Sequence, residues 1–441
     1  MTTSACALID GNFCQVSNRW ALSPRNDYLT INGLFIRSYP IKVEDISDRI
    51  NRVSLHVAKY PVGLQSRVQH VKLLLDEVSE DEFHMVGLYG TGGLGKSTLA
   101  KSIYNFIADQ FEGLCFLGDV RENSTPRNLK DLQEKLLSKM VRLDIKLRSV
   151  SEGIAIIKQG LCREKILLIL DDVDRLEQLE DLAEGLDWFG RGSGVIITTR
   201  DKHILTSHGI ESMHAVEELH GEEALELLMW MAFKNDRVPS IYEDILTLAI
   251  TYASGLPLAL VIIGSNLFGN SIEEWKCTLD EYEKIFNKEI QKILRVSYDA
   301  LEEKEQSIFL DMTCFFKGWK WADVKNILHD HYGHCVNYHL GKLAKKSFIN
   351  ITTIYPLGYI HDETLHNLIE HMGKEVVRQE SRNDPGERSR LWCPDDMVQV
   401  LRENTGTSKI EMIYMNFPSM EFEIDWNGEA FKKTTKLKTL Q

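Results

Sequence analysis

The chain has 441 residues, 43% hydrophobic and 26% charged, a composition typical of folded proteins with enough material for several domains. Its formal net charge of −14 argues against non-specific binding to nucleic acid or to anionic membranes, so we expect neither as a partner. The eight cysteines contain no C-x-x-C pair, which argues against a zinc site and against a disulfide framework.

The N-terminal region carries no targeting signal that we can identify. Residues 1–15 lack a basic segment followed by a long apolar core, and the longest apolar run, near residues 256–263, is too short to span a membrane. We therefore expect a cytoplasmic protein, with the nucleus as a second location. Residues 1–41 match no domain pattern, and we expect irregular structure there.

A strand, a glycine-rich loop and a helix are predicted between residues 85 and 107. The loop has the spacing G-x-x-x-x-G-K-S, which lets backbone amides surround phosphates while the lysine and the serine hydroxyl serve the outer phosphates and a magnesium ion. We therefore predict that the chain binds ATP or ADP with Mg²⁺. The predicted nucleotide-binding residues of the loop are Gly90, Gly92, Gly93, Gly95, Lys96, Ser97 and Thr98, and Ser97 is also a predicted magnesium ligand.

A second apolar run, residues 166–170, ends in two aspartates. Five unbroken apolar residues are typical of a central parallel strand that is covered on both faces. A nucleoside triphosphatase needs carboxylates at such a strand end to hold magnesium and to orient water. We therefore assign Asp171 to the magnesium ion and Asp172 to the water-polarising base, the candidate catalytic residue.

A third predicted strand, residues 194–199, delivers Arg200 to the same edge of the sheet. A guanidinium there can bind the outermost phosphate through two hydrogen bonds. Such a contact would distinguish ATP from ADP. Since an arginine after a strand is common, this role depends on the neighbouring motifs.

The pattern of elements predicts the fold class. Strand candidates near residues 85, 116, 166 and 195 alternate with helical segments, which indicates a parallel sheet with helices on both faces. Residues 217–294 are helical throughout, with a helix that starts at Pro257, and residues 295–378 mix helices with an extended piece at 348–354. A turn is predicted at residues 383–386. The expected fold is an α/β phosphate-loop NTPase domain followed by α-helical parts.

The motifs resemble, in content and order, the nucleotide-binding and adaptor region of plant intracellular immune receptors with leucine-rich repeats. The resemblance covers roughly residues 42 to 440, and receptors of this class usually begin with a Toll/interleukin-receptor-like domain. Beside the phosphate loop and the Asp171-Asp172 strand, the matching motifs are Val62-Gly63-Leu64, Phe116–Glu122, Thr198-Thr199-Arg200, Gly255–Leu260 and Phe309–Phe316.

The resemblance implies roles for further residues. It implies that Val62 and Gly63 line the adenine pocket and that Pro257 packs near the base. It also implies a winged-helix subdomain with a Met-His-Asp motif whose histidine reaches the diphosphate, and here the matching residue is His366. The implied organisation is an unassigned segment 1–41, a linker 42–61, a nucleotide-binding domain 62–216, a helical subdomain 217–294, a winged-helix subdomain 295–378, and a connector with the start of the repeats at 379–441.

The motif departs from the family at its last residue, because the triplet here is Leu365-His366-Asn367. An amide cannot accept the charge-assisted hydrogen bonds that a carboxylate accepts, which are about twice as strong as neutral ones. One interpretation is a looser latch on the ADP-bound resting state. The other is a neutral replacement whose amide makes the same contacts.

Both ends of the chain differ from the family pattern. Residues 1–41 do not resemble a Toll-like domain, so we do not transfer the NAD cleavage of that domain to this chain. Residues 431–440 resemble the start of one leucine-rich repeat, whereas an array needs at least about three repeats to bury a core.

The function implied by the resemblance is a molecular switch of plant immunity, with an ADP-bound resting form and an ATP-bound active form that assembles into homo- or hetero-oligomers. One alternative is a truncated adaptor or decoy that pairs with full-length receptors. Another is an enzyme that turns over ATP, although slow hydrolysis is the most that we expect. A GTPase is disfavoured because Asn287–Ile290 lacks the aspartate of the guanine-selecting N-K-x-D motif.

Overall fold

The computed structural model describes four strands before residue 38 and, beyond them, residues 54–76, 84–123, 125–141, 145–185, 187–234, 240–284, 286–351, 358–360, 364–414 and 432–440. The chain divides into two compact units, Met1–Ser54 and Leu55–Gln441.

The first unit contains two antiparallel hairpins, where we expected irregular structure. Strand β1 (Cys6–Ile9) pairs with β2 (Asn12–Gln15), and β3 (Tyr28–Ile31) pairs with β4 (Leu34–Arg37). The missed signal lies in the residues between the partners, Asp10-Gly11 and Asn32-Gly33, because such dipeptides are typical of two-residue hairpin connections.

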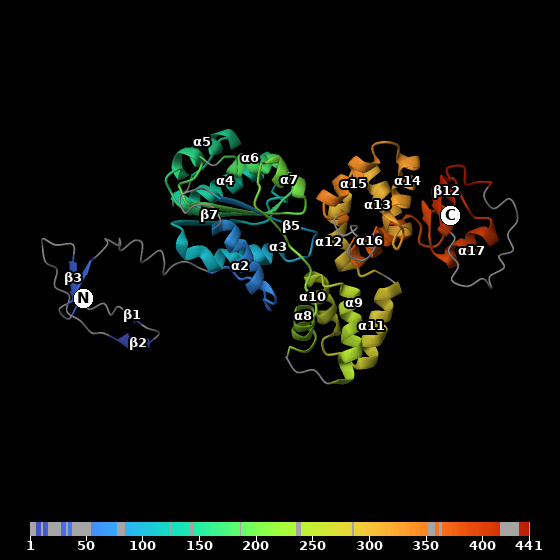
Figure 1. Cartoon of the computed structure of the whole chain (residues 1–441), viewed down its shortest axis with the longest axis horizontal. Coiled ribbons are helices and arrows are strands. Elements are labelled where there is room, and N and C mark those ends of the chain that lie inside the picture. The colour runs from blue at the N-terminus through green and yellow to red at the C-terminus, as the bar shows by residue number, and fades with distance from the viewer. Residues whose placement is uncertain are drawn as a thin grey trace. The chain divides into compact units, whose positions relative to one another are not determined.

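The second unit begins with a five-stranded parallel sheet (Figure 1). The strands lie in the order β6 (Gly113–Leu117), β7 (Ile166–Val173), β8 (Gly194–Thr199), β5 (His84–Tyr89) and β9 (Met213–Ala215). The predicted parallel sheet and its first four strands are confirmed. Strand β9 was not predicted, because three residues are too few to show a period. The carboxyl ends of all five strands meet at one edge, where ligands bind in open α/β sheets.

Helices cover both faces of this sheet, which explains the unbroken apolar run in β7. Leu167 and Ile169 pack into one core with α2 and α3, whereas Leu168 and Leu170 pack into a second core with α4 to α7. These helices are α2 (Leu64–Asp76), α3 (Lys96–Ile107), α4 (Pro126–Val141), α5 (Val150–Leu161), α6 (Leu176–Ala183) and α7 (Lys202–Ser207).

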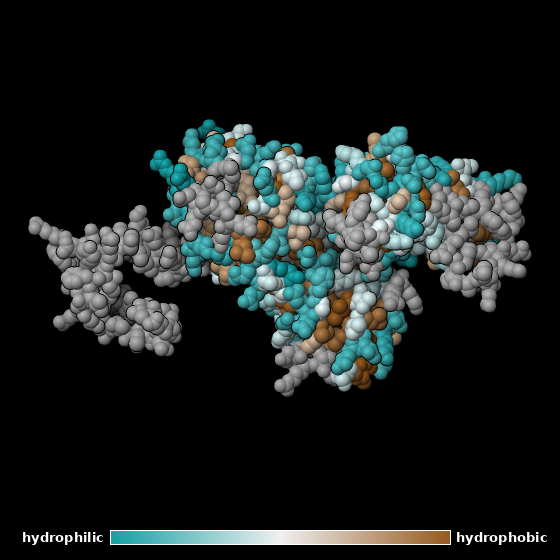
Figure 2. Space-filling model, in the orientation of Figure 1, coloured by the Kyte–Doolittle hydropathy of each residue, from teal (hydrophilic) through white to brown (hydrophobic). Residues whose placement is uncertain are grey.

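The next part is helical, as predicted, and consists of α8 (Glu222–Phe233), α9 (Glu243–Ala253), α10 (Pro257–Leu267) and α11 (Ile272–Lys284). Helix α10 begins at Pro257, as the sequence indicated, because the missing N–H of proline is not needed at the first position of a helix. Figure 2 shows a face on which hydrophilic residues predominate among the coloured ones, with hydrophobic residues gathered over the region of α9. Leu248 of α9 and the preceding Ile241 are among the exposed apolar side chains.

Five further helices follow: α12 (Lys288–Asp299), α13 (Glu303–Phe315), α14 (Trp321–Tyr332), α15 (Val336–Lys345) and α16 (Asn367–Glu380). The extended piece predicted at 348–354 is not a strand over residues 348–351, and residues 352–354 lie outside the described residues. Its apolar, β-branched composition is a context-dependent signal, and Asn350 N donates to Thr364 O at 2.8 Å without being part of a strand. None of the helices in the described part of the chain combines the length and the apolarity that a membrane span requires.

The C-terminal segment forms a small parallel ladder after the predicted turn, which is confirmed by the hydrogen bond from Gly386 N to Asp384 Oδ1 at 3.1 Å. The ladder contains β10 (Arg390–Leu391), β11 (Met412–Ile413) and β12 (Thr439–Leu440), with α17 (Pro394–Glu403) between the first two. Paired residues are separated by 22 positions from Arg390 to Met412 and by 27 from Met412 to Thr439. These spacings lie within the range of about 20–29 residues of leucine-rich repeats.

We expect Gly373→Ala to destabilise the fold, because a Cβ at this position of α16 would overlap the side chain of Thr313 on α13. Overpacking of this kind costs about 1–3 kcal/mol. The matched control is Gly341→Ala in α15, where a Cβ meets no atom within 4 Å. It should raise stability by up to about 1 kcal/mol through helix propensity. Thermal and urea unfolding measure both effects, and equal stabilisation by the two variants would contradict the packing.

Candidate functional site

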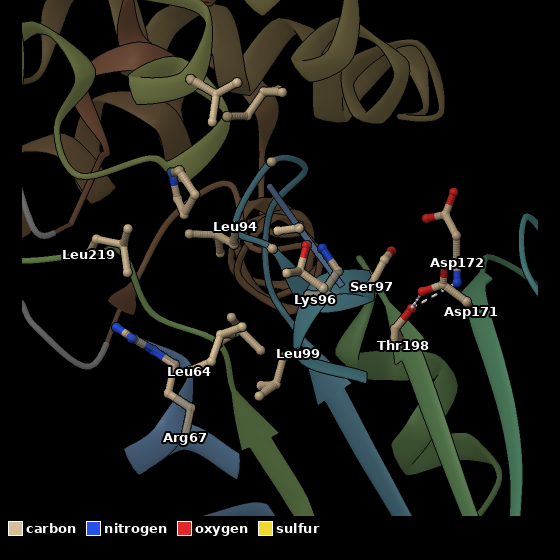
Figure 3. A pocket seen from close by; sticks show the side chains of 18 of the residues that line it. Leu64, Arg67, Leu94, Lys96, Ser97, Leu99, Asp171, Asp172, Thr198 and Leu219 are labelled. Carbon is tan, nitrogen blue, oxygen red and sulfur yellow. Dashed lines mark hydrogen bonds between the residues drawn. The ribbon is translucent and has the colours of Figure 1, made fainter. Parts of the chain in front are cut away.

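A cavity of about 460 Å³ lies at the carboxyl edge of the sheet, a size suited to a small-molecule ligand. Its walls come from the sheet, from the segment before α2, and from α8 and α10. Figure 3 shows Leu64 and Leu219 on one side, Asp171 and Asp172 on the other, and Lys96 between them. One side of the cavity is therefore mainly apolar, with Arg67 beside Leu64, and the other side carries the two acids.

The glycine-rich loop of residues 90–95 leads directly into helix α3. Gly95 precedes the helix with φ of 86°, and Gly93 has φ of 89°, a backbone conformation that side chains disfavour. Gly93, Gly95, Ser97 and Thr98 line the cavity together with Lys96. The free N–H groups at the start of α3 therefore lie at the cavity wall, where a helix N-terminus attracts anions.

Lys96 is buried beneath the loop and donates from Nζ to Gly90 O at 2.8 Å and to Thr91 O at 2.7 Å. Burial, followed by the neighbouring charge of Arg200, lowers the pKa of Lys96 to about 7. The charge on this side chain therefore depends on what else enters the cavity. An anion beside Lys96 would favour its ammonium form.

The two aspartates line the same cavity because strand β7 is irregular at its end. Consecutive residues of a regular strand point to opposite faces, but the pairing of β7 with β8 shifts between Leu170 and Val173. Asp172 has φ of 61°, which marks the bulge. Asp171 and Asp172 thereby both reach the cavity wall.

Asp171 lies in a position that suits a magnesium ligand. It accepts hydrogen bonds from Thr198 Oγ1 at 2.6 Å and from the Ser97 side chain. Burial raises the pKa of Asp171, and these two hydrogen bonds oppose that effect. A buried carboxylate beside a serine hydroxyl offers hard oxygen ligands, so the predicted pair Ser97 and Asp171 fits Mg²⁺.

Asp172, the predicted base, is paired with two arginines. Arg121 Nη2 lies 2.7 Å from its Oδ2, and Arg200 Nε lies 3.4 Å from its Oδ1. Arg200 also donates from Nη1 to Ile293 O at 3.2 Å and to Ser297 Oγ at 3.1 Å, both on α12. Arg200 thus lines the cavity and joins the sheet to α12, a second contact that the sequence did not predict.

The other predicted residues divide into two groups. Val62 and Pro257 line the cavity, close to the apolar side chains of its wall. Gly63, Gly90, Gly92 and His366 are not among the described residues that line it. For Gly92 the structure indicates a different role, because a Cβ there would meet Arg200 Nη1 at 2.8 Å.

His366 lies at the start of α16 and binds the turn between α9 and α10. Its Nδ1 accepts from Leu368 N at 3.1 Å, so Nε2 carries the proton and donates to Ser254 O at 3.1 Å. Asn367 donates from Nδ2 to Ser254 Oγ at 3.1 Å and accepts from Lys317 Nζ. The predicted contact between His366 and a diphosphate therefore stays a prediction, while its contact with the α9–α10 turn is observed.

Sequence reasoning missed the roles of Arg67 and Arg121, both of which line the cavity. Arg67 of α2 pairs with Glu223 at 3.0 Å and donates to Glu218 O at 3.1 Å. Arg121 stands in the motif Phe116–Glu122, but nothing in the sequence indicates that it meets Asp172. Glu223 lies 156 residues after Arg67, and Asp172 lies on β7 whereas Arg121 lies in the turn after β6, so no local sequence pattern indicates these contacts.

Comparison with known families supports this description. The NB-ARC domain family matches residues 64–238, and the winged-helix domain of Roq1-like disease resistance proteins matches residues 302–381. The second match covers α13 to α16, the part that carries His366 and Asn367.

Known proteins match most of the chain. Disease resistance protein RPV1 of Vitis rotundifolia is 36% identical over 88% of this chain and 27% of its own length. TMV resistance protein N of Nicotiana glutinosa is 34% identical over 90% of this chain and 34% of its own. The solved structure of Cdc6p from Pyrobaculum aerophilum, at 15% identity, aligns with 74% of this chain and 98% of that one at a TM-score of 0.38. The chain thus spans about a third or less of these resistance proteins, and it carries an NB-ARC domain and a Roq1-like winged-helix domain within its similarity to them.

Proposed function

We propose that this chain is an ADP/ATP-dependent molecular switch in plant innate immunity, with an ADP-bound resting form and an ATP-bound active form. The observation that carries the proposal is the composition of one cavity wall. One cavity is lined by three parts of the chain: the glycine-rich loop with Lys96, the two acids of β7, and the first turn of α10 with Pro257. A ligand there touches both the sheet and the helical part, so a change of ligand can alter how they meet.

The two regions of the cavity suit the two halves of a nucleotide. Val62, Leu219 and Pro257 belong to the apolar lining that would take the adenine base. Lys96 and the start of α3 would bind the phosphates, and Ser97 with Asp171 would hold Mg²⁺. Magnesium would neutralise phosphate charge next to the acids.

Direct contacts connect the cavity to the helices that would move. Leu258 N of α10 donates to Gly93 O of the loop at 3.2 Å. The turn before α10 contains Ser254. Its carbonyl oxygen accepts a hydrogen bond from His366, and its hydroxyl accepts one from Asn367. A shift of the loop is therefore transmitted to α10 and through its preceding turn to α16. Assembly into homo- or hetero-oligomers in the cytoplasm or nucleus, part of the same proposal, rests on family likeness and on the sequence.

The test of the proposal is the nucleotide that the chain binds. We expect Lys96→Met to raise the Kd for ADP by at least about tenfold, because the phosphates lose a charge-assisted hydrogen-bond partner. The control is Lys139→Met, which removes an exposed lysine of α4. Calorimetric titration with ADP, and identification of copurifying nucleotide by mass spectrometry, measure the effect. Unchanged ADP affinity in Lys96→Met, or no nucleotide binding by the parent chain, would overturn the proposal.

Nucleotide binding should weaken as the pH rises. Because the pKa of Lys96 is lowered to about 7, the side chain is mostly neutral above that pH, whereas phosphates favour its ammonium form. Binding therefore takes up a proton, and the Kd for ADP should rise by up to about tenfold per pH unit between about pH 7.5 and 9. Calorimetric titrations in buffers of different ionisation enthalpy measure the number of protons taken up when ADP binds. A Kd that stays constant over this range would contradict the assignment.

We expect Asn367→Asp to retain more ADP than the parent chain. A carboxylate would form an ion pair with Lys317, whose ammonium now donates to the neutral amide of Asn367. The Ser254 hydroxyl, which now donates to Thr251 O at 3.1 Å, can turn to donate to the carboxylate in place of the lost amide contact. The ion pair ties the start of α16 to the segment after α13, and the hydrogen bond keeps it on the α9–α10 turn. The readout is the fraction of purified protein that carries ADP after gel filtration. Equal retention would favour the alternative in which asparagine is a neutral replacement.

A further inference from the structure

Arg121 and Arg200 share one carboxylate at the charged end of the cavity. Both oxygens of Asp172 are engaged, Oδ2 by Arg121 at 2.7 Å and Oδ1 by Arg200 at 3.4 Å, and all three side chains are about one-fifth exposed. The main chain also fixes Arg121, because its N–H donates to Asp172 O at 3.0 Å. The two guanidiniums are therefore held by an anion that belongs to the protein itself.

The position of this group indicates which phosphate it would meet. Figure 3 shows Lys96 and Ser97 between the apolar side, marked by Leu219, and Asp172 on the far side. A base at the apolar side and phosphates over Lys96 would place the last phosphate nearest Asp172 and its two arginines. A diphosphate has one phosphoryl group fewer to extend in that direction.

We propose that Arg121 is a second phosphate-binding residue and that Asp172 holds Arg121 and Arg200 as a counter-ion which the terminal phosphate of a nucleoside triphosphate replaces. The inference rests on the proposed function and names the residues that distinguish triphosphate from diphosphate. Guanidinium groups bind phosphate and carboxylate oxygens with the same fork geometry, so the exchange needs no new donor. Asp119 and Glu122 also line the cavity, and the magnesium ion of the nucleotide would offset their charge.

The exchange has a consequence for α12, because Arg200 binds Asp172 and α12 at the same time. Its Nη1 donates to Ile293 O and Ser297 Oγ, while its Nε faces Asp172. The loop packs on the same guanidinium, since a Cβ on Gly92 would overlap it. If Arg200 turns from Asp172 toward a phosphate, its hydrogen bonds to α12 must change as well.

A purely structural role for Arg121 predicts a different result. If the ion pair only fixes the loop after β6, then its loss lowers the stability of the fold and weakens the binding of all nucleotides by the same factor. A phosphate-binding role instead predicts selective loss of triphosphate binding. The ratio of two dissociation constants therefore separates the two roles.

The experiment uses the full chain with Mg²⁺ and compares ADP with the slowly hydrolysed analogue adenosine 5′-thiotriphosphate by calorimetric titration. Arg121→Gln should weaken binding of the analogue by at least about tenfold and that of ADP by less than about threefold. Arg121→Lys keeps the charge and should lie between Arg121→Gln and the parent. The control Arg163→Gln removes an exposed arginine and should change neither constant. Thermal unfolding without nucleotide verifies that each variant is folded.

Asp172→Asn tests the counter-ion directly. Removing the carboxylate frees both guanidiniums, so the analogue should bind at least about threefold more tightly while ADP binding stays constant. Weaker or unchanged binding of the analogue would overturn the proposal, and so would equal losses for both nucleotides in Arg121→Gln. If the parent chain binds neither nucleotide, the proposed function itself fails. If it binds both and the Arg121 variants lose no selectivity, only this inference fails.

Discussion

The charged end of the cavity depends on one hydroxyl group that joins two strands. Thr198 Oγ1 donates to Asp171 Oδ1 and accepts from Asp172 N, so it binds the side chain of one acid and the main chain of the next. Without this group, a buried carboxylate and a partly buried N–H would each lose a partner, at a cost of up to about 1–3 kcal/mol apiece. The hydroxyl therefore stabilises the bulge that turns both acids to one side.

Contacts between the parts of the second unit converge on this cavity. The loop binds α10 through Gly93, Arg200 binds α12, and His366 of α16 binds the turn at Ser254. Each contact joins a cavity-lining residue, or a close neighbour of one, to a helix outside the sheet. Packed interfaces in general move between discrete arrangements rather than deform gradually, and the proposed switch would depend on such a movement here.

Much of the fold follows from local pattern. Five apolar residues in β7 predict burial on both faces, the loop glycines predict a strand–loop–helix connection, and Pro257 predicts a helix start. Other features escaped prediction for different reasons. The hairpins before residue 38 had a readable signal in Asp10-Gly11 and Asn32-Gly33, whereas β9 is too short to show a period. Residues 348–351 are not a strand, since β propensity is a strongly context-dependent signal.

The sequence by itself determined the chemistry of the cavity: a lysine and a serine after a glycine-rich loop, two acids after a buried strand, and an arginine after the next. Spacing along the chain carries that information because each group belongs to one local element. Only the tertiary structure decided the strand order, which places Thr198 beside Asp171, the bulge that brings both acids together, and the meeting of Arg121 with Arg200 on Asp172. These contacts join residues that are far apart in the chain. The spacing of residues within one helix or strand does not indicate which side chains of other elements they will contact.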